Sequence, residues 1–178
     1  MKKILLLATV VVFTLSAQSQ VMKAGVSLSL PVGDAGDISD FGGQLDFAYL
    51  FEINEAFQVG PMASFFFYNG KDFNTPIGKI DGESLLFLPL GGSARFLLED
   101  FFFGADLGYG IGLSPDGNDG GFFYRPKVGY NFGSLAAILS YSGISSERTV
   151  IVNGPFGPIS SSSSSTFGSI NAGVEFSF

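Results

Sequence analysis

The chain has 178 residues, of which 46% are hydrophobic and only 14% are charged, and its net charge is −7. An ordinary soluble domain carries about 25% charged residues, so this chain is far more apolar than such a domain. Its acidic balance argues against a nucleic-acid partner, and the absence of cysteine excludes disulfides and thiolate metal sites.

The N-terminal segment predicts a secretory signal peptide. Lys2 and Lys3 precede an apolar stretch at residues 4–15, and small or polar residues follow at 16–20. The apolar stretch is shorter than the about 20 residues that a transmembrane helix needs. We therefore expect residues 1–20 to be a cleaved signal peptide and residues 21–178 to form the mature domain. An uncleaved N-terminal anchor is the alternative.

The remaining chain alternates apolar and polar residues with a period of two, which is typical of strands with one apolar face. The alternation covers residues 23–32, 44–52, 57–68, 86–96, 101–113, 124–132, 135–142 and 168–178, and it is weakest in 135–142, where Ile138 shares a face with serines. The 25 glycines and 21 phenylalanines also favour strands over helices. We predict an all-β domain of eight antiparallel strands.

The segments between these strands alternate in length. Short turns are expected at residues 53–55, 99–100 and 133–134, and longer polar links at 33–40, 69–82, 115–121 and 145–166. This pattern predicts an eight-stranded transmembrane β-barrel with short periplasmic turns and long extracellular loops. Residues 150–159 contain further apolar side chains, so they either lengthen the seventh strand or form an extra hairpin, and a ten-stranded barrel is the alternative.

The C-terminal segment 168–178 places Ile170, Ala172, Val174, Phe176 and Phe178 on one face. With this ending, the chain resembles the small OmpA/OmpX-type outer-membrane β-barrels, in particular the porin-family-like single-domain barrels of Bacteroidetes-like bacteria. The resemblance implies location in a Gram-negative outer membrane and contact with outer-membrane lipid. It also implies that Phe176 and Phe178 form the signal for the barrel assembly machinery.

The sequence departs from such barrels in having no tryptophan for the interfacial girdles. Phenylalanine and tyrosine are expected to replace it at both interfaces. On the short-turn side these are Phe51, Phe57, Phe101, Phe103, Phe132 and Phe176, and on the loop side Phe65, Phe67, Tyr124 and Tyr141.

The residues that usually carry catalysis are missing. The sequence has neither His nor Cys, so it lacks the common general base and the thiol nucleophile. We predict no enzymatic activity, no cofactor and no metal site.

A glycine run, an Asp/Asn-rich segment and a serine run resemble functional motifs, but we interpret all three as structural. The G-x-G-x-G run at residues 108–112 lacks the following helix of a dinucleotide site, so we expect these glycines and Gly104 to make room for larger side chains in the lumen. Residues 116–120 resemble part of a calcium loop but lack its terminal Glu and flanking helices, and we expect an exposed flexible loop. The six serines at 160–165 predict a mobile loop.

Charged residues on the polar faces are expected to point into the lumen. An eight-stranded barrel has an interior just wide enough for side chains to fill, and an unpaired charge there costs several kcal/mol. We therefore interpret four cations and four anions as a structural network of ion pairs, with a narrow gated pore as the alternative. These residues are Lys23, Asp46, Glu52, Arg95, Asp106, Arg125, Lys127 and Glu175.

Together these observations predict a non-enzymatic outer-membrane barrel with a structural role or a surface-interaction role through its extracellular loops. The loop ligand is not indicated by any motif. One alternative is a narrow porin-like channel for small solutes. Another is a soluble exported lipocalin-type binder of a hydrophobic ligand, because such a barrel also alternates with a period of two.

Overall fold

The computed structural model describes residues 20–178 except 76–77, 81, 116–117 and 155–156, and for residues 73–81 and 147–164 it describes only the backbone. The predicted signal peptide lies outside the described residues, apart from Gln20, which begins the first strand. Among the residues described, no helix has the length and apolarity needed to cross a bilayer.

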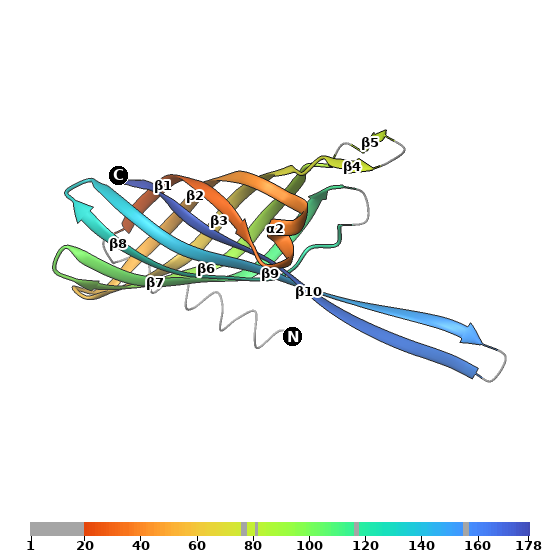
Figure 1. The fold of residues 1–178 in the computed structure, drawn as a ribbon. Helices are drawn as coiled ribbons and strands as arrows, with labels where there is room; N and C mark the ends of the chain where they lie inside the picture. The colour runs from red at the N-terminus through yellow and green to blue at the C-terminus, as the bar shows by residue number, and fades with distance from the viewer. Residues whose placement is uncertain (1–19, 76–77, 81, 116–117, 155–156) are drawn as a thin grey trace.

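Eight antiparallel strands close into a barrel, as predicted from the alternation (Figure 1). The first and last strands pair from Lys23↔Ser177 to Val32↔Gly168, and this pairing closes the wall. The order around the barrel is β1-β10-β9-β8-β7-β6-β3-β2. The strands are β1 (Gln20–Val32), β2 (Ser39–Asn54), β3 (Phe57–Gly70), β6 (Leu85–Leu98), β7 (Phe101–Ser114), β8 (Gly121–Phe132), β9 (Leu135–Gly154) and β10 (Gly157–Ser177).

Three tight turns lie at one end of the barrel, which we call the short-turn rim. They comprise residues 55–56, 99–100 and 133–134, close to the predicted positions. Glu99 and Gly133 have φ of 53° and 79°, which is the left-handed conformation that tight hairpin turns use. Both ends of the barrel domain also lie here, because Phe178 N donates to Met22 O at 2.9 Å.

The opposite end, which we call the loop rim, carries the longer connections. Helix α2 (Asp34–Ile38) joins β1 to β2, and a small hairpin of β4 (Phe73–Thr75) and β5 (Gly78–Ile80) lies between β3 and β6. Lys71 ties these two connections together. Its backbone N donates to Ile38 O at 2.9 Å, and its Nζ lies 3.5 Å from Asp40 Oδ1.

The fourth long connection differs from the expected loop and confirms the alternative, in which residues 150–159 lengthen the seventh strand and form a hairpin. We expected residues 145–166 to be a loop with a mobile serine run, but β9 and β10 stay paired as far as Gly154↔Gly157, and the serines at 160–165 pair with residues 146–151. This projecting hairpin (residues 146–154 and 157–167) extends well beyond the barrel in Figure 1. The physical reason lies in the facing strand, where residues 149–152 are β-branched and favour extended backbone.

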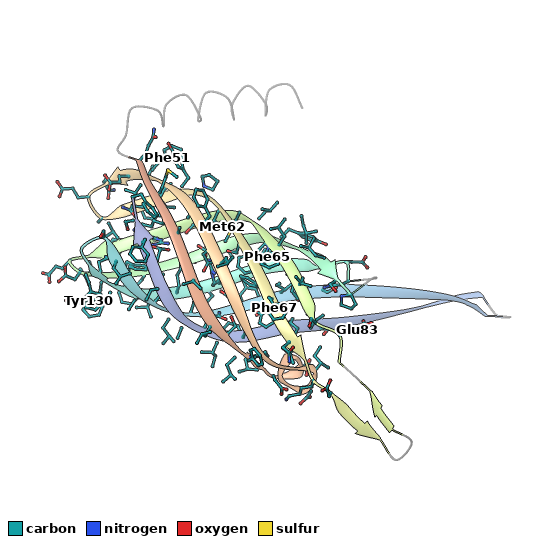
Figure 2. The ribbon with its side chains drawn as sticks, turned by 90° about the horizontal axis from the view of Figure 1, so that it is seen from above. Phe51, Met62, Phe65, Phe67, Glu83 and Tyr130 are labelled. Carbon is teal, nitrogen blue, oxygen red and sulfur yellow. The ribbon has the colours of Figure 1, made fainter. Side chains whose placement is uncertain are left out.

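The barrel wall has an apolar outside and a more polar inside. Outward side chains such as Leu28 (78% exposed) and Phe132 (63%) alternate with buried ones such as Ser27 and Ser29. In Figure 2, outward-facing side chains surround the wall, with Phe51 toward the short-turn rim and Phe67 toward the loop rim. The apolar face predicted for each strand is therefore the outer face.

Candidate functional site: the barrel interior

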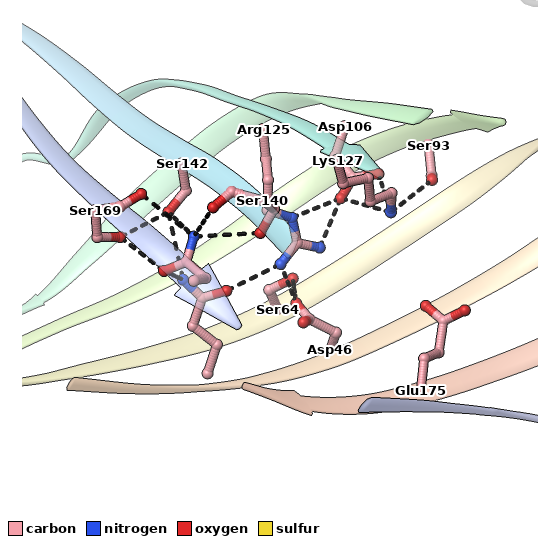
Figure 3. Close-up of polar contacts among 12 residues, drawn as sticks. Asp46, Ser64, Ser93, Asp106, Arg125, Lys127, Ser140, Ser142, Ser169 and Glu175 are labelled. Atoms are coloured by element: carbon pink, nitrogen blue, oxygen red, sulfur yellow. Dashed lines mark hydrogen bonds and ion pairs between the residues drawn. The ribbon is translucent and has the colours of Figure 1, made fainter. Parts of the chain in front are cut away.

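Arg125 of β8 is the centre of the main charged cluster (Figure 3). Its Nε donates to Asp106 Oδ2 at 2.8 Å, and its Nη2 lies 2.6 Å from the same oxygen. Asp106 is the register partner of Arg125 on β7, so the strand pairing alone brings this pair together. Arg125 Nη1 reaches across the lumen to donate to Asp46 on β2. The guanidinium therefore links opposite walls of the barrel.

Lys127 extends this cluster toward the short-turn rim. Its Nζ lies 2.7 Å from Asp106 Oδ1 and donates to Ser93 Oγ at 3.3 Å. Asp106 is fully buried, and Lys127 is 8% exposed. One buried carboxylate is thus held between two cations, and this arrangement compensates its charge away from water.

A second cluster lies closer to the short-turn rim. Arg95 of β6 donates to both carboxylate oxygens of Glu175 on β10, at 2.5 and 2.6 Å. This is the two-bond geometry in which arginine pairs most strongly with a carboxylate. Lys23 Nζ lies 3.7 Å from Glu175 Oε1, and the Arg95 guanidinium stacks 4.7 Å from the centre of the Phe102 ring.

Glu52 differs from the other seven predicted lumen charges. Among the described residues it makes no ion pair, and its Oε1 accepts a hydrogen bond from Gln58 Nε2 at 3.2 Å. It lies near the end of β2 at the short-turn rim and is partly exposed. Water can therefore solvate this carboxylate, which lies outside the ion pairs formed among the described lumen residues.

A layer of uncharged polar side chains borders the Arg125 cluster on the side of the loop rim. Gln44 Nε2 donates to Asn171 Oδ1 at 2.6 Å, and Gln44 Oε1 accepts from Arg125 Nη1 at 3.1 Å. Asn171 Nδ2 donates to Ser142 Oγ at 3.0 Å, and the Tyr68 and Ser169 hydroxyls lie 2.8 Å apart. The layer takes its uncharged side chains from β2, β3, β9 and β10, and Gln44 also bonds Arg125 of β8. It satisfies the hydrogen bonds of these buried polar groups and lies between the charged cluster and the aromatic side chains.

Aromatic rings fill the lumen next to the loop rim. Phe66 packs 5.6 Å from Phe123 and 6.1 Å from Tyr68, measured between ring centres. Phe167 lies 4.6 Å from Tyr68 and 5.6 Å from Phe87. Sequence reasoning did not assign the inward phenylalanines to the lumen. The alternation of side chains along the strand could have identified Phe66 as inward-facing, because it lies on the same face as Ser64 and Tyr68.

The glycines of β7 have the predicted role at Gly104 and Gly110, but not at Gly108, where a Cβ would lie 2.1 Å from the backbone oxygen of Leu90. A Cβ on Gly104 would lie 3.2 Å from both Arg95 Cγ and Lys127 Cε, and one on Gly110 would lie 3.0 Å from Ile144 Cδ1. The bare backbone therefore makes room for the interior arginine, lysine and isoleucine side chains.

The predicted assembly residues lie outside the lumen. Phe176 and Phe178 face outward at the short-turn rim and are 49% and 76% exposed.

No cluster of three or more potential metal ligands occurs in the part of the chain that the structure describes. The interior thus holds two clusters of paired charges, bordered by aromatic side chains, with Glu52 outside both clusters.

Comparison with known proteins confirms the fold. No protein-family model matches the sequence, and no curated protein sequence matches it. Among solved structures, the chain is similar to the Yersinia pestis outer membrane protein Ail in a phospholipid bilayer nanodisc, with 15% identity and a TM-score of 0.51 over 90% of this chain and 99% of that one. It is also similar to the outer membrane protein AlkL in lipid bilayers, with 13% identity and a TM-score of 0.44 over 90% of each chain. The closed barrel of eight strands and the similarity to Ail show that the chain has the fold of the small outer-membrane β-barrels.

Proposed function

We propose that this chain is a non-enzymatic protein of a bacterial outer membrane, exported by a cleaved signal peptide, whose closed barrel anchors the projecting hairpin at the cell surface. The observation that carries the proposal is the change in pairing at the loop rim. In the described pairings, β9 meets β8 only as far as Ser145, and β10 meets β1 only from Gly168 onward. Beyond these residues no further strand pairs with either outer edge in the part of the chain that the structure describes, and an unpaired strand edge is a template for a strand of another molecule.

The outer surface supports the membrane location. Leu28, Leu107 and Leu139 are more than half exposed, on strands all around the wall. Lipid is the natural surrounding of such a belt, because a soluble lipocalin-type binder would place these side chains inside. The C-terminal strand, with Phe176 and Phe178 exposed, is the proposed contact with the barrel assembly machinery.

The filled interior favours an anchor over a channel. The clusters around Arg125 and Arg95 connect opposite walls, and the rings around Phe66 fill the lumen above them. In planar lipid bilayers, we expect the refolded chain to give no steady conductance above that of the bare bilayer. Reproducible single-channel steps would instead favour the narrow channel.

Protease accessibility on intact cells tests the location and orientation. A thrombin site inserted after Gly154, at the tip of the projecting hairpin, should be cut by protease added outside the cells. A matched site inserted between Gly133 and Ser134, in a tight turn of the opposite rim, should be cut only after the outer membrane is opened. Equal cleavage of both sites in intact cells, or cleavage of the turn site alone, would contradict the proposal.

A variant that keeps the barrel and lacks the hairpin tests the proposed surface-interaction role. Ser146 and Ser165 are register partners, so an Asn-Gly turn replacing residues 147–164 closes the strands without a gap. We expect cells that display the full chain to aggregate or to adhere to protein surfaces, and cells that display the trimmed chain to lose that property. Full retention of both by the trimmed chain, at equal surface amounts, would show that the hairpin is not the interacting element.

A further inference from the structure

A small pocket opens at the loop rim, above the aromatic rings that close the lumen. Its volume is about 160 Å³. It lies between helix α2, the start of β6, the β7–β8 connection and the point where β9 and β10 leave the barrel. The lining residues are Ile38, Leu85, Phe87, Asn118, Gly120, Ile144, Ser146, Ser165 and Phe167.

The walls of this pocket are mainly apolar. Phe87 and Ile144 are buried, and Phe87 lies 5.6 Å from Phe167 between ring centres. A cavity of about 150 Å³ lined by Leu, Ile and Phe binds benzene. The volume here is similar, and Leu85, Phe87 and Ile144 form an apolar wall on which a single ring can pack.

The pocket wall formed by residues 118–120, just before β8, is held by hydrogen bonds. Asn118 Nδ2 donates to Ser114 O at 3.0 Å, and Asn118 Oδ1 accepts from Gly120 N at 3.2 Å. Tyr109 OH, on the outer face of β7, donates to Asp119 O at 3.0 Å. Gly120 has φ of 74°, and a Cβ there would lie 1.8 Å from Gly110 O, so only glycine fits. A site whose wall is already ordered loses little conformational entropy when a ligand binds.

The opening of the pocket is polar. Ser146 and Ser165 face each other across β9 and β10, and their hydroxyls can donate to or accept from a ligand hydroxyl. We propose that this pocket binds a small monocyclic molecule that carries one hydroxyl group, with the ring against Phe87 and Ile144 and the hydroxyl toward the two serines. The rings around Phe66 lie beneath the pocket, so the molecule is held at the cell surface and does not pass through the barrel.

Phenol is the probe for this site. We would refold the chain in lipid nanodiscs with ¹³C-labelled isoleucine methyl groups and titrate phenol while recording methyl NMR spectra. The Ile144 methyl signals should shift and saturate, whereas those of Ile170, which faces the lipid, should drift without saturating. Two-ring 2-naphthol is larger than the single ring proposed here and should bind at Ile144 more weakly than phenol.

Two tryptophan variants separate the pocket from partition into the lipid. Ile38→Trp fills the pocket opening and should weaken phenol binding at Ile144 by about tenfold or more. Ile53→Trp changes a similarly exposed isoleucine at the opposite rim (40% against 46% exposed) and should keep the affinity within about twofold. Equal binding by both variants, or parallel unsaturated shifts at Ile144 and Ile170, would overturn the proposal. The trimmed chain retains Ser146 and Ser165, so its phenol binding is independent of the hairpin's interaction role.

Discussion

Strands β9 and β10 exist in two environments within one molecule. Inside the barrel wall each has a second neighbouring strand, a lipid-facing side and a side facing the lumen, where Asn171 and Glu175 are locked by buried partners. In the projecting hairpin the same two strands continue in the same register, but the described pairings there are only with each other. Backbone pairing is therefore common to both regions, and what differs is the packing and electrostatics around it.

Because of this difference, we expect the barrel wall and lumen to determine the free energy of unfolding, and the hairpin to add little to it. An isolated two-stranded hairpin is only marginally stable in water, so the barrel has to supply the free energy that keeps the hairpin's base in register. Changes to the lumen should therefore affect unfolding strongly, and changes to the hairpin should affect it little. The following predictions test this contrast.

Removing the central cation should have the largest effect. Arg125→Met leaves Asp46 with only its hydrogen bond from Ser64, and it removes one of the two cations at Asp106. Breaking a buried ion pair in this way costs about 3–5 kcal/mol. We expect a loss of that size in the free energy of unfolding, measured by urea titration in lipid vesicles.

An exposed ion pair provides the control for this substitution. Lys71→Met removes the pair with Asp40 at the loop rim, where the Lys71 side chain is 35% exposed and that of Asp40 is 53% exposed. Solvent-exposed pairs contribute only about 0–1 kcal/mol. If the two substitutions gave equal losses, the lumen charges would not be the stabilising network described above.

An inward aromatic ring should have an intermediate effect. Phe102→Leu removes the ring over the Arg95 guanidinium, and a buried contact of this kind contributes about 1–2 kcal/mol. The neighbouring residue Phe103 faces outward and is 54% exposed, so Phe103→Leu should change the free energy of unfolding by less than about 0.5 kcal/mol. A reversed order of the two variants in the same urea titration would mean that the assigned strand faces are wrong.

Trimming the hairpin should have the smallest effect on the barrel. The chain with Asn-Gly in place of residues 147–164 should unfold within about 1 kcal/mol of the full chain, because local segments outside a core contribute little to global stability. In the full chain, amide hydrogen exchange should be much faster at residues 148–153 than at 137–143. Equal protection of the two ranges in the isolated protein would contradict the contrast between hairpin and wall.

Much of the barrel could be predicted from the sequence because a period of two assigns every residue of a strand to one face. The inward positions of Arg95, Asp106 and Glu175 followed from this parity alone. Which charges meet did not follow, because contacts such as Arg95 with Glu175 cross the lumen between strands that are not neighbours. Such contacts depend on the tilt and stagger of the closed barrel, which a single strand does not encode.

Two other features were missed for physical reasons. Apolar residues were assigned to the lipid face, so Phe66 and Phe123 were not placed in the lumen, although a closely packed interior also needs large side chains to fill it. The serine run at 160–165 has the composition of a flexible linker, but its extended conformation comes from pairing with the β-branched residues opposite, which composition alone does not reveal.

Spin labelling tests the central claim, that the apolar face of the barrel lies in lipid, most directly. The chain contains no cysteine, so Leu107→Cys and Glu55→Cys each provide a single attachment site, one on the outer wall and one in a tight turn. In lipid vesicles, we predict that the label at residue 107 is accessible to molecular oxygen and shielded from a water-soluble nickel complex, with the opposite result at residue 55. A label at residue 107 that the nickel complex reaches as readily as at residue 55 would contradict a membrane-spanning barrel.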